Sequence, residues 1–200
     1  MNKRAAVFLD LNGTLVLPIK PQSLSELTPV TGAEKAIARL SRAGLLCPVV
    51  TVQSRISKGI FSLDEFRHWF NDFARRLSAF GGKILGPYVC AHRFREPCEC
   101  KKPSTFLYEQ AAKEHGIDLR QSFVIGDSVE DVCAAHRFGG CGCLVRTGWA
   151  ESPVVVERAA QYASFVAESL GTAVDWVLDR YRPRVGVRVV GFGLAPYSNW

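Results

Sequence analysis

The sequence has no run of apolar residues long enough to cross a membrane, since a span needs about 18 to 20 of them in a row. Its first residues, MNKRAAVFLDLNG, pass from two basic residues into a short apolar stretch without a cleavage-type site. Internal repeats and low-complexity segments are also absent. We therefore expect neither a secretory signal nor a membrane partner, and we expect a cytoplasmic protein.

The composition is that of an ordinary globular protein. The chain has 200 residues, 48% of them hydrophobic, which is enough for one domain with a full core. The net charge of +6 favours anionic partners such as phosphorylated metabolites, nucleic acid or acidic surfaces. We expect a monomer with one domain over residues 1–181. A basic, glycine-rich tail over 182–200 would follow, and its role stays open.

Short apolar stretches alternate with helical patterns along the chain. We expect strands over 5–9, 45–52, 83–89, 122–125 and 142–145, and helices over 33–40, 63–80, 104–115, 129–138, 154–170 and 173–181. This alternation implies right-handed crossovers in an α/β fold, a doubly wound parallel sheet with helices on both faces. We also expect no large cap domain.

Two capping boxes predict helix starts, one at Thr31–Glu34 and one at Ser62–Glu65. Large apolar side chains follow the second box at steps of three and four residues: Phe66, Trp69, Phe70, Phe73, Leu77 and Phe80. We interpret this stripe as the core-facing side of a helix rather than as a cofactor site.

Reactive side chains follow several predicted strands at the point where each strand ends. Asp10, Thr51 and Asp127 stand at three such ends, Asp131 follows four residues after Asp127, and Lys102 precedes a helix. The carboxyl ends of parallel strands meet at one edge of a sheet, so these groups should converge. A carboxylate nucleophile, a hydroxyl, a cation and a carboxylate pair are what phosphoryl transfer through a phospho-aspartate requires.

A second cluster combines three cysteines with a histidine inside eleven residues: Cys90, His92, Cys98 and Cys100. A closed Cys₃His set is a structural zinc site without an open position for catalysis, so we expect a zinc loop over residues 90–100. The alternative is that the cysteines are reduced free thiols without a metal, since Cys98 and Cys100 are poorly placed to form a disulfide with each other. The other cysteines, Cys47, Cys133, Cys141 and Cys143, are expected to be small buried hydrophobes.

The segments Asp10–Thr14, Thr51, Lys102–Pro103 and Gly126–Asp131 resemble the four motifs of the haloacid dehalogenase (HAD) superfamily. Two further stretches, TVQSRISKG at 51–59 and CAHRFREPCECKKP at 90–103, narrow the match. They are similar to segments of the D-glycero-D-manno-heptose 1,7-bisphosphate phosphatases and of the N-terminal domains of histidinol-phosphate phosphatases.

The resemblance implies a Mg²⁺-dependent phosphatase of a phosphorylated small molecule, a sugar phosphate or bisphosphate. It implies that Asp10 is the nucleophile and that Thr51 and Lys102 hold the phosphoryl oxygens. The implied Mg²⁺ ligands are Asp10, the backbone carbonyl of Asn12, and Asp127. It places Gln53, Ser54, Lys101 and Ser128 near the substrate, gives supporting places to Gly13, Thr14 and Asp131, and implies the same four zinc ligands.

Asn12 departs from the HAD phosphatases, in which this position is an aspartate that serves as general acid and then as general base. An amide can do neither, and a positioned acid or base typically contributes about 10²- to 10⁴-fold. Three explanations stay open: a slow or specialised phosphatase, an inactive protein that binds a phosphorylated ligand or a partner, or a substitution made on purpose to trap a complex.

The substrate is less well defined than the reaction. The segment LVLPIKPQSLSELTPV at 15–30 lacks the Gly-Tyr-Val of the resembled family, and Val52 and Ser128 also differ from it. A nucleic-acid 3′-end phosphatase is a third possibility for a basic chain. The basic residues are scattered, however, and no aromatic platform for bases is evident, so nucleic acid is not the expected partner.

Overall fold

The structure is a computed structural model, and it describes residues 3–93 and 95–181. The tail predicted at 182–200 lies outside the described residues. Within those described ranges, no helix is both long and apolar enough to cross a membrane.

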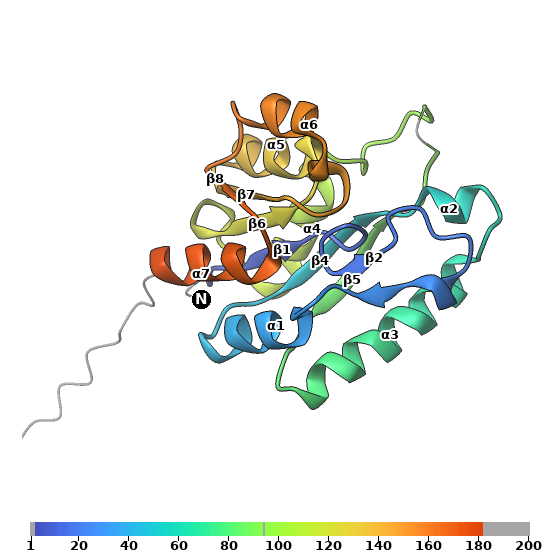
Figure 1. The fold of residues 1–200 in the computed structure, drawn as a ribbon, viewed down its shortest axis with the longest axis horizontal. Coiled ribbons are helices and arrows are strands. Elements are labelled where there is room, and N and C mark those ends of the chain that lie inside the picture. The colour runs from blue at the N-terminus through green and yellow to red at the C-terminus, as the bar shows by residue number, and fades with distance from the viewer. Residues whose placement is uncertain (1–2, 94, 182–200) are drawn as a thin grey trace, which may run out of the picture.

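Six parallel strands form the central sheet in the order β5-β4-β1-β6-β7-β8 (Figure 1). Their bounds are β1 Val7–Leu9, β4 Pro48–Val52, β5 Leu85–Cys90, β6 Phe123–Gly126, β7 Cys141–Val145 and β8 Phe165–Ala167. The predicted parallel sheet is confirmed. The chain builds outward from β1 first on one side and then on the other, which places the carboxyl end of β1 at the topological switch point where such sheets bind ligands.

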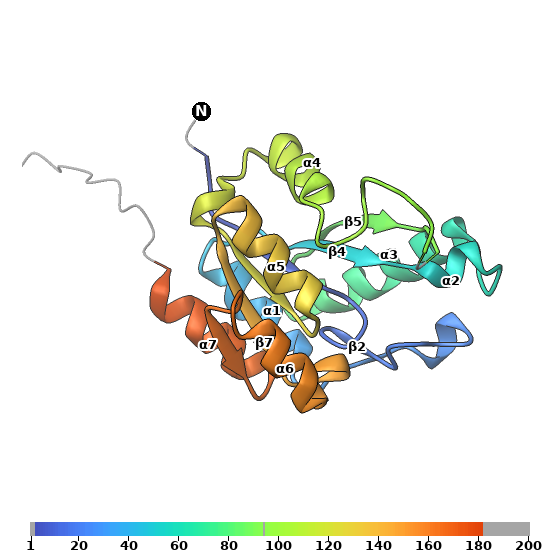
Figure 2. The ribbon, with the colours of Figure 1, turned by 90° about the horizontal axis from the view of Figure 1, so that it is seen from above.

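Helices cover both faces of the sheet (Figure 2). One face carries α1 Ala33–Arg42, α3 Leu63–Ala79 and α7 Leu170–Arg180, and the other carries α4 Phe106–His115 and α5 Val129–Phe138, with α6 Pro153–Ala159 packed beside α5. Successive side chains of a strand point to opposite faces. Accordingly, Val7 and Leu9 belong to the first core cluster and Phe8 to the second.

The capping box predicted for α3 is present. Ser62 Oγ accepts a hydrogen bond from the Glu65 N–H at 3.1 Å, and the Ser62 N–H donates to the Glu65 carboxylate at 2.6 Å. Phe66, Phe70, Phe73 and Leu77 are buried as predicted. Phe80 is 63% exposed, so its assignment to the core was wrong, because the helix ends at Ala79 and its buried face ends with it.

The box predicted at Thr31–Glu34 is not formed. Gly32 is the N-cap of α1, with a φ of 79°, and its carbonyl accepts from the Ala36 N–H. That φ lies in the left-handed region, where glycine meets no steric penalty, so the turn before the helix uses Gly32 in place of a threonine cap.

The helix predicted over 154–170 was also wrong. It divides into α6 and the sixth strand β8, which pairs with β7 through Leu144 and Val166. The three residues of β8 are too few to show a period in the sequence. Pairing with a distant strand therefore decides their conformation.

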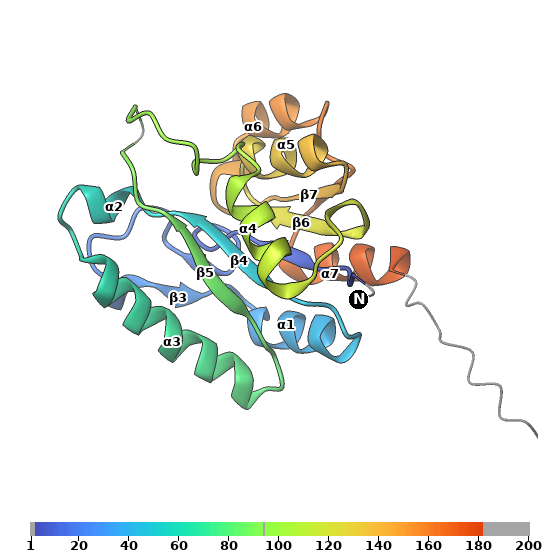
Figure 3. The same cartoon turned by 180° about the vertical axis from the view of Figure 1, so that it is seen from behind.

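Small elements surround the carboxyl edge of the sheet. They are the antiparallel hairpin of β2 Val16–Leu17 and β3 Thr28–Pro29, the short α2 Ser54–Ser57, and the loop between β5 and α4. Three 3₁₀ turns complete the described elements: η1 Leu24–Glu26, η2 Leu119–Gln121 and η3 Gly148–Glu151. Figure 3 shows the β5–α4 loop beside α2. In the described part of the chain, these short elements border the carboxyl edge of the sheet.

Candidate active site

Lys102 lies at the centre of a buried group of charges. Its Nζ donates to Asp10 Oδ1 at 2.5 Å and to Asp131 Oδ1 at 2.6 Å. The lysine is 7% exposed, and the two aspartates are 8% and 1% exposed. Asp10 follows β1 and Asp131 lies in the first turn of α5, so folding brings together three residues that are distant in sequence, as predicted.

Asp131 is also held at its second oxygen. Oδ2 accepts hydrogen bonds from the Ser128 hydroxyl at 2.6 Å and from the Ser128 N–H at 3.2 Å. A Cβ at Gly126 would overlap the Asp131 carboxyl group, so only glycine allows this close approach at the end of β6. The Ser128 hydroxyl, predicted near the substrate, thus bonds to Asp131.

Asp127 lies next to this pair and is 1% exposed. Its Oδ2 accepts from the Trp149 N–H at 2.7 Å. One carboxylate oxygen from each of Asp10, Asp127 and Asp131 lies within 4.8 Å of the others, as the ligands of one ion would. Three buried carboxylates face one ammonium, and carboxylate oxygens are ligands that Mg²⁺ prefers. The donor set therefore fits a divalent cation.

The electrostatics of the group reflect its burial. Burial, partly offset by Lys102, raises the pKa of Asp10 to about 6. Burial and the neighbouring carboxylates Asp10 and Asp131 raise the pKa of Asp127 well above its usual value. Burial acts to lower the pKa of Lys102, but the two aspartates that it contacts raise that pKa well above the usual value. The ammonium is therefore charged at neutral pH, and a further cation would favour ionisation of the acids.

Asn12 is fixed at both ends of its amide. Oδ1 accepts from Gln53 Nε2 at 2.7 Å, and Nδ2 donates to the Pro18 carbonyl at 3.2 Å. Gln53 Nε2 also lies 3.0 Å from Thr51 Oγ1, and both Thr51 and Gln53 are buried. The structure thus brings Asn12, Thr51 and Gln53 together, and it ties Asn12 to the segment that follows β2.

The cysteine–histidine cluster lies in the β5–α4 loop. Cys90 Sγ is 3.8 Å from Cys98 Sγ and 3.6 Å from His92 Nδ1, and Cys100 Sγ is 3.2 Å from the same nitrogen. On a tetrahedral zinc ion with Zn–S bonds of about 2.3 Å, two sulfurs lie about 3.8 Å apart. The four side chains could therefore hold one zinc ion at Sγ and Nδ1.

Two basic residues hold the same loop, one by a contact with α2 and one by contacts inside the loop. The Arg93 guanidinium donates to the Ser57 carbonyl at 3.1 Å and 3.2 Å, which joins the loop to α2. Lys101 Nζ donates to the carbonyls of Arg93 and Glu96 within the loop. Lys101 was predicted near the substrate, and the structure gives it these partners inside the loop, one residue before Lys102.

Comparison with known proteins shows the family. Residues 99–173 match the family described as "HAD-hyrolase-like". The chain is 31% identical over 196 residues to the D-glycero-D-manno-heptose-1,7-bisphosphate 7-phosphatase of Thermosynechococcus vestitus, covering 90% of this chain and 99% of the relative. It is 33% identical to the Haemophilus ducreyi enzyme named D-glycero-beta-D-manno-heptose-1,7-bisphosphate 7-phosphatase, covering 87% and 98%. This chain belongs to the HAD phosphatase family.

Solved structures agree with that assignment. The D,D-heptose 1,7-bisphosphate phosphatase of B. bronchiseptica, solved with magnesium and phosphate, superposes with a TM-score of 0.78 at 25% identity. The match covers 89% of this HAD phosphatase and 100% of that chain. The corresponding enzyme of Burkholderia thailandensis gives a TM-score of 0.66 at 25% identity, covering 88% and 100%.

Thr14 and Ser54 are two further residues of this HAD phosphatase that were predicted to belong to the site. Thr14 is fully buried, and its hydroxyl has no hydrogen-bond partner among the described residues. Ser54 begins α2 and is half-buried next to Gln53. Their predicted places, supporting for Thr14 and near the substrate for Ser54, stay predictions.

Sequence reasoning missed the segment after β7. Thr147, Gly148 and Trp149 contact the turn after Asp10 and the Asp127 carboxylate. The chain reads RTGWAE there, which carries no motif-like signal beyond a glycine shortly after a predicted strand.

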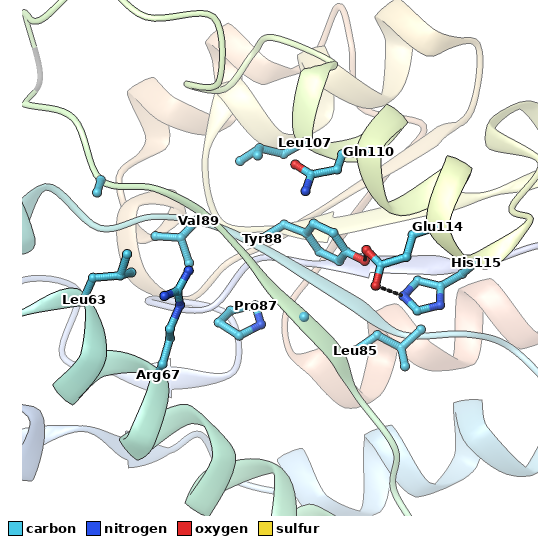
Figure 4. A pocket seen from close by; sticks show the side chains of 12 residues that line it. Leu63, Arg67, Leu85, Pro87, Tyr88, Val89, Leu107, Gln110, Glu114 and His115 are labelled. Atoms are coloured by element: carbon cyan, nitrogen blue, oxygen red, sulfur yellow. Dashed lines mark hydrogen bonds and ion pairs between the residues drawn. The ribbon is translucent and has the colours of Figure 1, made fainter.

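A concavity of about 420 Å³ lies away from the carboxylates, along the edge strand β5 between α3 and α4 (Figure 4). Tyr88, Glu114, His115 and Arg67 are among its lining residues. The Tyr88 hydroxyl donates to Glu114, which also pairs with His115. None of the predicted site residues is among the described residues that line it.

Proposed function

We propose that this chain is a Mg²⁺-dependent phosphomonoesterase of a phosphorylated sugar, of the heptose bisphosphate type, with turnover lowered by Asn12. The observation that carries the proposal is the buried pairing of Asp10 and Asp131 with Lys102 beside Asp127. The relatives at 31% and 33% identity are named for the heptose 1,7-bisphosphate substrate, which supports the substrate class.

Asp10 is the nucleophile in this proposal. Its carboxylate attacks phosphorus, the bond to the leaving oxygen breaks, and a phospho-aspartate forms. Lys102 and the Thr51 hydroxyl hold the phosphoryl oxygens, since an ammonium and a hydroxyl donor aimed at developing charge stabilise the transition state. Asp10, the Asn12 backbone carbonyl and Asp127 would hold Mg²⁺, which when bound offsets the repulsion between carboxylate and phosphate.

Asn12 limits both halves of the reaction. Its amide bonds with Gln53 and with the Pro18 carbonyl, and it has no titratable proton to give to the leaving group. After the first step, no carboxylate at this position activates the water that hydrolyses the acyl phosphate. The phosphorylated form of Asp10 therefore persists longer than it would with an aspartate at position 12.

Zinc has a structural place in the proposal. Cys90, His92, Cys98 and Cys100 hold the ion and close the loop that leads into Lys102, two residues after the last ligand. A closed set of four protein ligands leaves no position for substrate.

The test is phosphate release from a panel of sugar and polyol phosphates with Mg²⁺, measured for the unaltered chain and for Asn12→Asp. The substitution is expected to raise turnover by about 10²- to 10⁴-fold on at least one substrate, because it supplies the missing acid and base. Intact-protein mass after exposure to acetyl phosphate should show the acyl phosphate in the unaltered chain and less of it in Asn12→Asp. Absence of phosphate release from both proteins on the whole panel would overturn the proposal.

A second candidate is an inactive protein that binds a phosphorylated ligand. The observation that favours it is the pairing of both ends of the Asn12 amide inside the protein. It predicts that phosphate or a sugar phosphate binds, as measured by calorimetry, while neither the unaltered chain nor Asn12→Asp gives turnover.

A further inference from the structure

The geometry points to the segment Thr147–Trp149 as a positioning element for the Mg²⁺ site, acting on Asp127 and on the turn that presents the Asn12 carbonyl. This inference rests on the proposed function. The three residues follow shortly after β7, and β7 pairs with β6 in continuous parallel register, so the segment is anchored to the sheet that carries Asp127. We name it the β7 brace.

The first contact of the β7 brace is with the turn after the nucleophile. The Thr147 hydroxyl donates a hydrogen bond to the Gly13 carbonyl, which belongs to the residue next to Asn12. The turn is also closed internally, because the Gly13 N–H donates to the Val16 carbonyl at 2.8 Å. Thr147 thus adds a hydrogen bond from another loop to the turn that presents the Asn12 carbonyl, one of the proposed Mg²⁺ ligands.

The second contact is with Asp127 itself. The Trp149 N–H donates to Asp127 Oδ2 at 2.7 Å, so one carboxylate oxygen is fixed by the backbone. Asp127 is 1% exposed, so its carboxylate is shielded from solvent. A backbone donor holds this oxygen independently of which side chain residue 149 carries.

The third contact is steric. A Cβ at Gly148 would overlap both Asp127 Oδ2 and the Gly13 Cα, and a Cβ at Gly13 would overlap the same carboxylate. Two glycines from different loops therefore enclose Asp127, and both have a positive φ, of 57° and 94°. Any side chain at either position would displace the carboxylate or the turn.

These contacts give the β7 brace a defined task. Two parts of the proposed ligand set follow different strands: the Asn12 carbonyl follows β1, and Asp127 follows β6. The ends of these two strands therefore set the distance between the two parts. Because the β7 brace contacts both parts, it fixes their spacing before the ion arrives. A preorganised carboxylate set binds a cation more tightly than one that must be ordered by it.

The test is the affinity of Mg²⁺ for the unaltered chain, for Thr147→Val and for Thr147→Ser. It is measured by titration calorimetry on zinc-loaded protein dialysed free of Mg²⁺. Valine keeps the shape but removes the donor, so the dissociation constant should rise about five- to tenfold, the effect of one lost hydrogen bond. Serine keeps the donor and should stay within about twofold of the unaltered chain.

A matched control is Thr172→Val at the start of α7, where a threonine hydroxyl also makes a hydrogen bond, to Ser169. It should leave the Mg²⁺ affinity unchanged. Gly148→Ala should weaken binding more than Thr147→Val does, because it displaces Asp127 directly.

Two results would overturn the inference, and they differ in whether the proposed function also fails. If Thr147→Val lowers thermal stability but binds Mg²⁺ like the unaltered chain, the segment is merely structural and the proposed function stands. If the unaltered chain itself binds no Mg²⁺, the Mg²⁺ dependence in the proposed function fails and the β7 brace fails with it.

Discussion

Asp10, Asp127 and Asp131 come from the ends of two strands and from a helix, whereas Cys90, His92, Cys98 and Cys100 lie within one loop of eleven residues. The carboxylates are almost fully buried, and Lys102, Ser128 and the Trp149 backbone hold them. Three of the four zinc-type ligands are only half-buried. Their mutual contacts are those that one ion would impose.

The difference indicates how each site is stabilised. The sheet positions the carboxylates, so their arrangement does not depend on an ion. A bound cation would reduce the repulsion between them. None of the described loop residues 91–93 and 95–101 is fully buried, and metal binding there would supply folding free energy. Loss of metal should therefore change the chemistry of the first site and the folding of the second.

The largest expected effect is at the nucleophile. Asp10→Asn should lower phosphate release on the best substrate by about 10³-fold or more, because the attacking carboxylate is removed. Zinc content, measured by elemental analysis, should stay the same in this variant. Unchanged hydrolysis would mean that the chemistry lies elsewhere.

The next effect concerns the loop. Cys98→Ser should lower the zinc content and destabilise the loop by several kcal/mol, measured by urea unfolding and by limited proteolysis. Phosphate release should fall too, because Lys102 follows the last ligand by two residues. Cys141→Ser, which changes a cysteine outside both clusters, is the control. Full zinc content in Cys98→Ser would contradict the proposed ligand set.

A smaller effect is expected at Glu96, which lies beside the proposed zinc ligand His92. Glu96 Oε1 lies 4.0 Å from His92 Nε2, the ring nitrogen opposite the one that faces the cysteines. Such carboxylates orient a ligating histidine, and their loss typically weakens metal binding about tenfold. Glu96→Gln should therefore weaken zinc affinity by about that factor in competition with a chromogenic chelator, with phosphate release intact at saturating zinc. Equal affinities would mean that this carboxylate does not orient the ring.

The smallest expected effect is a loss of folding stability with rising pH, which arises at the carboxylate site. Without Mg²⁺, folded Asp10 has a pKa of about 6 against an ordinary value of 3.8, so the folded state holds this proton more tightly than the unfolded chain does. The stability that this proton contributes is present below about pH 4 and is lost as the pH rises through 6, which amounts to about 1 kcal/mol between pH 5 and 7.5.

Urea unfolding at the two pH values, with and without Mg²⁺, measures this loss. Mg²⁺ should reduce it, and Asp10→Asn should show less of it than the unaltered chain. A stability that rises over this range in the Mg²⁺-free protein would contradict the raised pKa.

Helices with a clear local sequence pattern were predicted correctly. The capping box at Ser62 and the apolar stripe behind it defined α3, and α5 was predicted with its observed bounds, Val129–Phe138. The predictions failed where distant contacts decide. Gly32 replaced the expected Thr31 cap, and Phe165–Ala167 became a strand because β7 offered an unpaired edge.

The sequence by itself determined the parallel sheet, the residues at its carboxyl edge and the short spacing of the cysteine–histidine cluster, because each follows from period, order along the chain or ligand type. Only the tertiary structure decided that Lys102 bridges Asp10 and Asp131, that Asn12 is held by Gln53 and Pro18, and that Thr147–Trp149 encloses Asp127. These contacts join segments far apart in the chain, and no local pattern encodes which strand ends become neighbours.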